Sequence, residues 1–238
     1  MSSLSRTLFC SALLCVTSSQ LWAVCGVPQP RLVCAEATNS KAVVIARLVR
    51  RRFVPSETDS DLNIYSLKNI QLIRGNIAQT FVVNERNDSG RSGVHWIVGE
   101  EYLLFVSYNG PEHAYTVEGC SNSDFLSKSS KNISEVMALS SSKVQPIISG
   151  LVSNEAWSDG ISDAEVIVSG PTGIFRTRSG SDGRFELRVH PGTYSVTASA
   201  PAFTFTHGIF SYEKPDSVTV QNGTCAQVHL EGHLSKRP

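Results

Sequence analysis

Residues 180–201 (GSDGRFELRVHPGTYSVTASAP) constrain the fold more than any other stretch of the chain. Two runs within it alternate apolar and polar side chains, which is the pattern of a β-strand with one buried face. The apolar positions are Phe185, Leu187 and Val189 in the first run and Tyr194, Val196 and Ala198 in the second. His190-Pro191-Gly192 lies between the runs, and proline and glycine both favour turns. The stretch therefore predicts two strands paired as a β-hairpin within a sandwich.

Short apolar runs bounded by Gly, Pro and Asn continue on both sides of this stretch. They cover residues 147–152, 164–168, 175–178, 203–210, 217–220 and 225–230. Short strands separated by frequent turn residues are typical of a β-sandwich. We therefore expect a seven-stranded β-sandwich over residues 147–234, as the second part of a mainly β protein.

Three motifs in this region resemble the carboxypeptidase regulatory-like module, which is also called transthyretin-like. They are an opening G-x-V at 150–152, T-x-S-x-x-D-G-x-F at 177–185 and P-G-x-Y-x-V at 191–196. The resemblance implies a fold that is shared with carbohydrate-binding modules. It implies no particular ligand.

Residues 25–140 hold a second set of strand patterns. The apolar runs are 42–48, 62–73, 80–83, 102–106 and 115–120. Asn109-Gly110 suits the turn of a hairpin between the last two runs. From 131 to 140 the apolar residues recur at spacings of three and four, which predicts a helix. Five strands and one helix fit a small OB-like barrel with a C-terminal helix.

The first 23 residues predict a signal peptide. Arg6 precedes a short apolar run at 8–16, and Ala23 ends a plausible cleavage site. The predicted location is therefore secreted, periplasmic or extracellular. Cleavage leaves the cysteines Cys25, Cys34, Cys120 and Cys225. These allow three complete pairings, and an oxidising destination favours disulfide bonds over free thiols.

Residues 24–140 also resemble a netrin-like domain, the fold of the tissue inhibitors of metalloproteinases. The resemblance rests on the leading Cys25 and Cys34, VVIARLV at 43–49, Arg74-Gly75, G-x-x-Y-L-L-F at 99–105, and Cys120-Ser121 before the helix. It implies a Cys25–Cys120 disulfide. Cys34 and Cys225 are then left, either to pair across the two domains or to stay free. Val94-His95-Trp96 departs from the family, which commonly has a cysteine there.

Composition and motifs exclude several classes of function. The chain has 21 basic and 21 acidic side chains, so no net charge favours nucleic acid or an acidic membrane. No segment after residue 23 is apolar for long enough to span a membrane.

Arg50-Arg51-Arg52 fits a strand end in solvent better than a nucleic-acid or heparin site. His229 and His233 are expected to be solvent-exposed rather than zinc ligands. The sequence carries no H-E-x-x-H, G-x-S-x-G or phosphate-binding glycine loop. We therefore expect neither catalytic activity nor a cofactor or metal.

The resulting prediction is an exported, non-catalytic binding protein with an extracellular protein or glycan as its partner. Its expected organisation is a signal peptide at 1–23, a netrin-like domain at 24–140, a polar linker at 141–146 and a sandwich domain at 147–234. One alternative is carbohydrate binding through the sandwich. Trp157, in the polar loop 154–160 (NEAWSDG), is the candidate to stack on a sugar ring.

The other alternative is metalloproteinase inhibition through the first domain. Inhibition by the family's mechanism requires the free amino group of the first cysteine to reach the proteinase zinc. Cleavage after Ala23 would leave Val24 in front of Cys25. The nitrogen of Cys25 would then be an amide, whose lone pair is delocalised into the peptide bond and binds zinc poorly.

Overall fold

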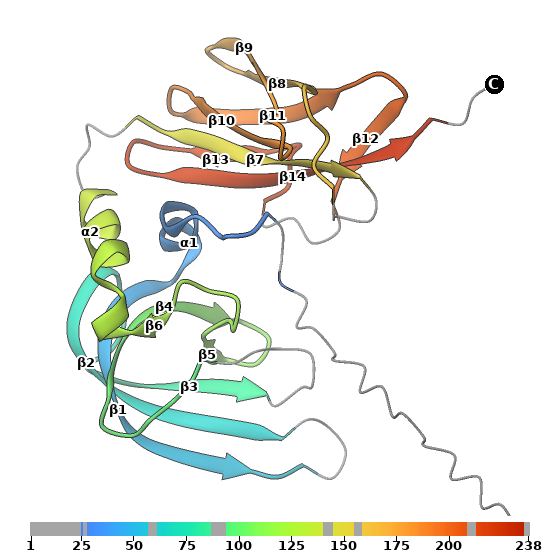
Figure 1. The fold of residues 1–238 in the computed structure, drawn as a ribbon. Coiled ribbons are helices and arrows are strands. Elements are labelled where there is room, and N and C mark those ends of the chain that lie inside the picture. Colours follow the sequence, from blue (N-terminus) through green and yellow to red (C-terminus); the bar gives the residue numbers. More distant parts are fainter. Residues whose placement is uncertain are drawn as a thin grey trace, which may run out of the picture.

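The computed structural model describes residues 25, 28–56, 61–86, 94–139, 145–154, 159–208 and 213–235. The chain is mainly β, as predicted, with fourteen strands and two α-helices in these residues. The predicted signal peptide, Val24, most of the linker and Trp157 lie outside the described residues. Figure 1 shows the strands in two groups, with the first below α1 and the second above it.

The first group is a closed barrel. Its strands are β1 (Ala42–Val54), β2 (Leu62–Gly75), β3 (Thr80–Arg86), β4 (Glu101–Asn109), β5 (Ala114–Thr116) and β6 (Asp124–Phe125). The sheet order is β1-β2-β3-β5-β4-β6, and β1 also pairs with β4, so five strands form a ring. Register shifts along β1 bend this long strand, which allows it to pair with β2 and β4 together. The ring has the OB-like arrangement that the sequence predicts.

Aromatic rings fill one end of the barrel. The rings of Tyr65 and Trp96 stack with centroids 4.5 Å apart, and Tyr102 lies 5.1 Å from Trp96 and 5.0 Å from Phe125. The Tyr102 hydroxyl is buried but hydrogen-bonded, because it accepts from the Ile97 amide at 2.6 Å. This contact holds the segment before β4 against the barrel.

The second group is a β-sandwich. Its strands are β7 (Ile147–Asn154), β8 (Glu165–Gly170), β9 (Gly173–Arg178), β10 (Arg184–Arg188), β11 (Gly192–Ser199), β12 (Phe203–His207), β13 (Val218–Val220) and β14 (Cys225–Leu234). They form two four-stranded sheets in the orders β10-β7-β14-β12 and β13-β11-β8-β9. The described residues thus hold one strand more than the seven predicted, because each of the eight apolar runs between residues 147 and 230 forms a strand. β7 and β14 pair in parallel, and all other strand pairs in the sandwich are antiparallel.

The predicted hairpin between β10 and β11 is wrong. β10 pairs with β7, whereas β11 pairs with β8 and β13, so the two strands lie in facing sheets. Their buried faces are nevertheless as predicted, since Phe185, Val189, Tyr194 and Val196 all enter the same core. A period of two shows which face is buried, and it is the same for strands that pair and strands that face each other. The connection at His190-Pro191 therefore crosses between sheets.

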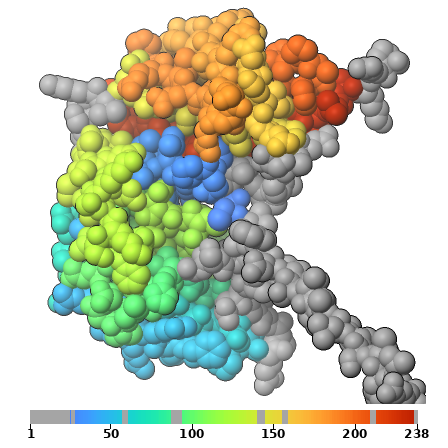
Figure 2. Space-filling view, in the orientation of Figure 1, coloured from blue at the N-terminus to red at the C-terminus, as the bar shows by residue number. Residues whose placement is uncertain are grey.

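Two helices complete the described structure. α1 (Val33–Asn39) and α2 (Ser130–Leu139) pack on each other and on the barrel through Val33, Ala37, Val136 and Leu139. α2 is the helix predicted at 131–140. In Figures 1 and 2 the blue α1 region lies between the green barrel and the orange and red sandwich. Among the described residues, no helix has the length and apolar character needed to cross a bilayer.

Candidate functional site

The chain before α1 lies along the outer face of the sandwich. Here residues 28–32 are called the entry segment. The buried side chain of Gln227 on β14 accepts a hydrogen bond from the Leu32 amide at 2.9 Å. Its amide nitrogen donates to the carbonyls of Pro28 at 3.3 Å and Pro30 at 3.0 Å. Gln227 can make all three bonds because its amide carries one acceptor oxygen and a nitrogen with two N–H donors. Gln227 thus makes three of the hydrogen bonds of the entry segment, and Arg184 and Asn122 donate to the carbonyls of Gln29 and Arg31.

Two disulfides flank the entry segment. Cys25–Cys120 joins the residue before it to the end of the barrel, and Cys34–Cys225 joins α1 to β14. The second bridge spans 191 residues of sequence. Asn39 on α1 adds a hydrogen bond of 2.7 Å to Glu213 of the sandwich. We call these contacts, together with those of Gln227, the seam between barrel and sandwich.

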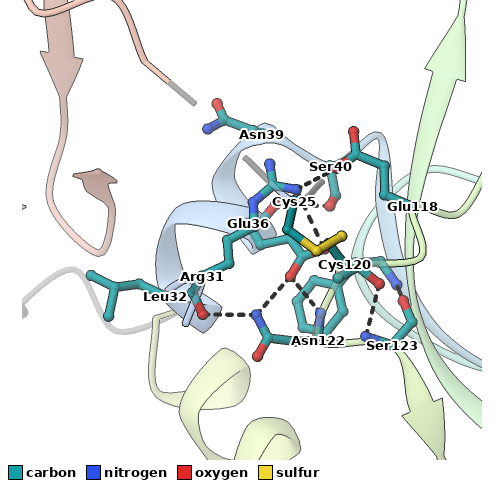
Figure 3. Close-up of polar contacts among 12 residues, drawn as sticks. Cys25, Arg31, Leu32, Glu36, Asn39, Ser40, Glu118, Cys120, Asn122 and Ser123 are labelled. Atoms are coloured by element: carbon teal, nitrogen blue, oxygen red, sulfur yellow. Dashed lines mark hydrogen bonds and ion pairs between the residues drawn. A yellow bond between two sulfur atoms is a disulfide. The ribbon is translucent and has the colours of Figure 1, made fainter. Parts of the chain in front are cut away.

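A buried carboxylate lies on the barrel side of the seam (Figure 3). Glu36 on α1 is only 2% exposed. Its Oε2 accepts hydrogen bonds from the Asn122 amide at 2.8 Å and from Asn122 Nδ2 at 2.7 Å. Arg31 Nη1 lies 3.7 Å from the other oxygen and 2.9 Å from Glu118. Burial raises the pKa of the Glu36 carboxyl, although Arg31 and the Asn122 hydrogen bonds act in the opposite direction.

Glu36, Asn122 and Gln227 were not predicted from the sequence. Signals for two of them are present, because a buried polar residue inside an apolar pattern requires a partner. Glu36 lies between two alanines, and Gln227 interrupts the apolar run of β14. Their partners are 86 and 195 residues away, respectively, and no local pattern indicates them.

The three arginines 50–52 lie within β1 and divide between its two faces. Arg51 donates to Asn63 at 3.0 Å and lies over the Tyr65 ring. Arg50 and Arg52 point to the other face. There they line a groove of about 390 Å³ on β1, β2 and β3, together with Ile64, Ser66, Val82 and Asn84. These six residues are called the β1–β3 face.

The predicted solvent exposure of His229 is wrong. His229 is completely buried, and its Nε2 lies 2.8 Å from Ser153 Oγ. The chain at Gly208 covers it so closely that a Cβ there would lie 2.0 Å from His229 Nδ1. Burial lowers the pKa of His229, so it is held as the neutral imidazole. His233 is half-buried beside Thr206, at 2.9 Å. The described residues contain no cluster of three or more His, Cys, Asp or Glu side chains that could hold a metal ion.

Comparison with known families supports the class of the sandwich. Residues 147–230 match the family described as Carboxypeptidase regulatory-like domain. This confirms the predicted resemblance for β7 to β13 and for most of β14. No curated protein matches the chain. The netrin-like resemblance of residues 24–140 is not shown by any comparison and stays a prediction.

Several solved structures are remotely similar to the chain. The Bacillus anthracis TIE protein is 13% identical with a TM-score of 0.29, and the match covers 80% of this chain and 34% of that one. The C-terminal fragment of the pilus adhesin SpaC from Lactobacillus rhamnosus GG is 7% identical with a TM-score of 0.27, over 91% and 97% of the two chains. This chain thus spans about a third of the first protein. Similarities with TM-scores this low carry no inference about fold or function.

Proposed function

We propose that the mature chain is an exported, non-catalytic binding protein for an extracellular partner. In this proposal a netrin-like domain at 24–140, a linker at 141–146 and a sandwich domain at 147–234 act as one scaffold. Export is supported by the predicted signal peptide and by the two disulfides. Lack of catalysis is supported by the family match, which is to a regulatory-like module.

The observation that carries the proposal is the seam. In a netrin-like inhibitor the segment at the first cysteine would meet the proteinase. Here the entry segment is hydrogen-bonded to Gln227 and flanked by both disulfides. If the chain at Cys25 moved out to reach a proteinase zinc and took the entry segment with it, that segment would leave β14 and expose a buried glutamine. The geometry therefore favours a scaffold in which this segment joins barrel and sandwich.

Carbohydrate binding through Trp157 is not advanced as a second function. Trp157 lies outside the described residues. Two other aromatic residues of the sandwich, Phe203 and Phe205, are half-buried, and Phe205 packs against the core.

The proposal is tested on the purified exported protein. We expect an amino terminus at Val24 and no inhibition when this material is titrated against a panel of zinc proteinases. A matched Gln227→Ala variant loosens the entry segment but keeps the same amino terminus. It too should fail to inhibit, because its Cys25 nitrogen is still an amide. Tight inhibition by the wild type, or retention of residues 1–23 in a cytosolic product, would refute the proposal.

A further inference from the structure

The β1–β3 face consists of two rows of side chains that cross three strands. Arg50 pairs with Ser66, and Ser66 pairs with Val82. In the second row Arg52 pairs with Ile64, and Ile64 with Asn84. Each row therefore begins with an arginine on β1. The shorter side chains of β2 and β3 form the floor of the groove beside the arginines.

Among the described residues, the two arginines of this face have no acidic partner. Two other arginines on β1 and β3 have acidic partners: Arg47 lies 2.7 Å from Glu101, and Arg86 lies 3.2 Å from Glu112. In contrast, no acidic side chain among the described residues forms an ion pair with Arg50 or Arg52, and both are exposed.

The sandwich provides a matched pair for comparison. Arg176 and Arg178 are also two residues apart on one strand, β9, and both are exposed. Each has an acidic partner at 2.9 Å, which is Glu165 for Arg176 and Asp163 for Arg178. Two arginines with the same spacing thus have acidic partners on the sandwich, whereas on the barrel they have none among the described residues.

The groove lies on the face of the sheet rather than at its edge. β2 pairs with both β1 and β3, whereas β1 pairs with β4 only over Ala42–Arg47, so at Arg50 and Arg52 its only partner strand in the described part of the chain is β2. A ligand that lies in the groove covers this face and is recognised by side chains. Those side chains are charged on β1 and mixed on β2 and β3, where Ile64 and Val82 are apolar and Ser66 and Asn84 are polar.

We propose that the β1–β3 face binds an extended acidic segment of a partner protein, in which Asp or Glu alternates with aliphatic residues. Two residues along a strand span about 7 Å, and side chains on one side of an extended peptide repeat at the same distance. Successive carboxylates therefore meet Arg50 and Arg52 in register, where arginine forms paired hydrogen bonds to carboxylate. Alternating side chains point to opposite sides of an extended peptide, so a peptide that runs along the groove with its carboxylates toward β1 turns its aliphatic side chains toward Ile64 and Val82 on β2 and β3. This proposal names a surface and a partner class that the proposed function leaves open.

The test uses the full mature protein and a short fluorescein-labelled peptide that alternates Glu and Val. Fluorescence anisotropy gives its Kd for the wild type, for Arg50→Gln/Arg52→Gln and for the matched control Arg176→Gln/Arg178→Gln. We expect the first variant to weaken binding by roughly tenfold, the sum of two exposed ion pairs, and the control to bind as the wild type does. An isomeric peptide with its Glu and Val residues in two blocks should bind more weakly, and added salt should weaken all binding.

Several results would overturn the proposal. They are no binding of the alternating peptide, equal binding of the block peptide, or equal losses in the two double variants. Polygalacturonate that competes more tightly than the peptide for Arg50 and Arg52 would assign the face to an acidic glycan instead. All variants change exposed side chains, and their unfolding curves show whether the fold is retained. None of these results bears on proteinase inhibition, so failure here is distinguishable from failure of the proposed function.

Discussion

The barrel and the sandwich fill their interiors with different kinds of side chain. The barrel end holds the rings of Tyr65, Trp96, Tyr102 and Phe125. The sandwich core is largely valine, at positions 152, 166, 168, 189, 196, 218, 220 and 228. A ring of five strands encloses a wide interior that large rings can fill, whereas two facing sheets about 10 Å apart are filled by interdigitating β-branched residues. The difference shows that each part has a core of its own.

Removal of the Cys34–Cys225 disulfide, which links the two parts, should have the largest effect on stability. We expect the wild type to unfold in a single thermal transition and Cys34→Ser/Cys225→Ser to unfold in two. The bridge closes a loop across most of the chain, and chain-entropy reasoning gives an upper value of about 5 kcal/mol for its contribution. Scanning calorimetry of the oxidised proteins measures the number of transitions and the loss of stability.

The matched control is Cys25→Ser/Cys120→Ser, which removes a bridge on the barrel side alone. This variant should lower the temperature at which the barrel unfolds. The sandwich should still unfold together with the barrel. If the Cys34–Cys225 variant still unfolds in one transition, the noncovalent seam couples the two cores by itself.

Core substitutions should sharpen the comparison further. Tyr102→Ala removes a fully buried ring with a hydrogen-bonded hydroxyl and should cost about 3–5 kcal/mol. Val168→Ala removes two methyl groups from an equally buried site and should cost about 1–3 kcal/mol. Urea unfolding of the two variants tests the ranking. A larger loss for Val168→Ala would mean that the barrel tolerates the cavity by closing around it.

The sequence predicted which faces of the strands are buried better than it predicted how the strands pair. Phe185 and Tyr194 were correctly placed in a core, but in a hairpin that does not exist. The alternation of apolar and polar side chains shows which face of a strand is buried. Which strands pair depends on residues far apart in the sequence. The closure of the barrel through β1 and β4 depends on bends in β1 that no local pattern shows.

The candidate sites were less predictable still. The arginine run was visible in sequence, but its division into Arg51 on one face and Arg50 and Arg52 on the other follows from the strand period only once β1 is known to include them. The neutralisation of Arg176 depends on Glu165 from a neighbouring strand. His229 was expected in solvent because its cover, the chain at Gly208, comes from a different strand connection.

The seam should show the smallest effect, as a dependence of stability on pH. Burial raises the pKa of Glu36 in the folded state, so its contribution to stability is fully present below the unfolded pKa. That contribution is lost as the pH rises through the folded, raised value. We therefore expect the wild type to lose stability relative to Glu36→Gln as the pH is raised from 4 to 7. Urea unfolding at each pH measures the difference.

Glu118→Gln is the control for this experiment, since Glu118 shares Arg31 with Glu36 but its side chain is half exposed. It should follow the wild type across the same pH range. A wild type that gains stability over Glu36→Gln as the pH rises would show that Arg31 and Asn122 outweigh the cost of burial.

The parallel pairing of β7 with β14 has a consequence for how the protein is made. β14 is central in its sheet, between β7 and β12, although it is the last strand of the sandwich along the chain. A chain that emerges from its amino end must keep β7 unpaired on this side until almost all of the sandwich has followed. During the same interval Cys225 has not yet been made, so Cys34 cannot form its native disulfide. Cys25 and Cys120 have already been made and could pair with Cys34 instead. Correct oxidation therefore depends on the order in which cysteines emerge, and a chaperone or disulfide isomerase has its longest opportunity to act during that wait.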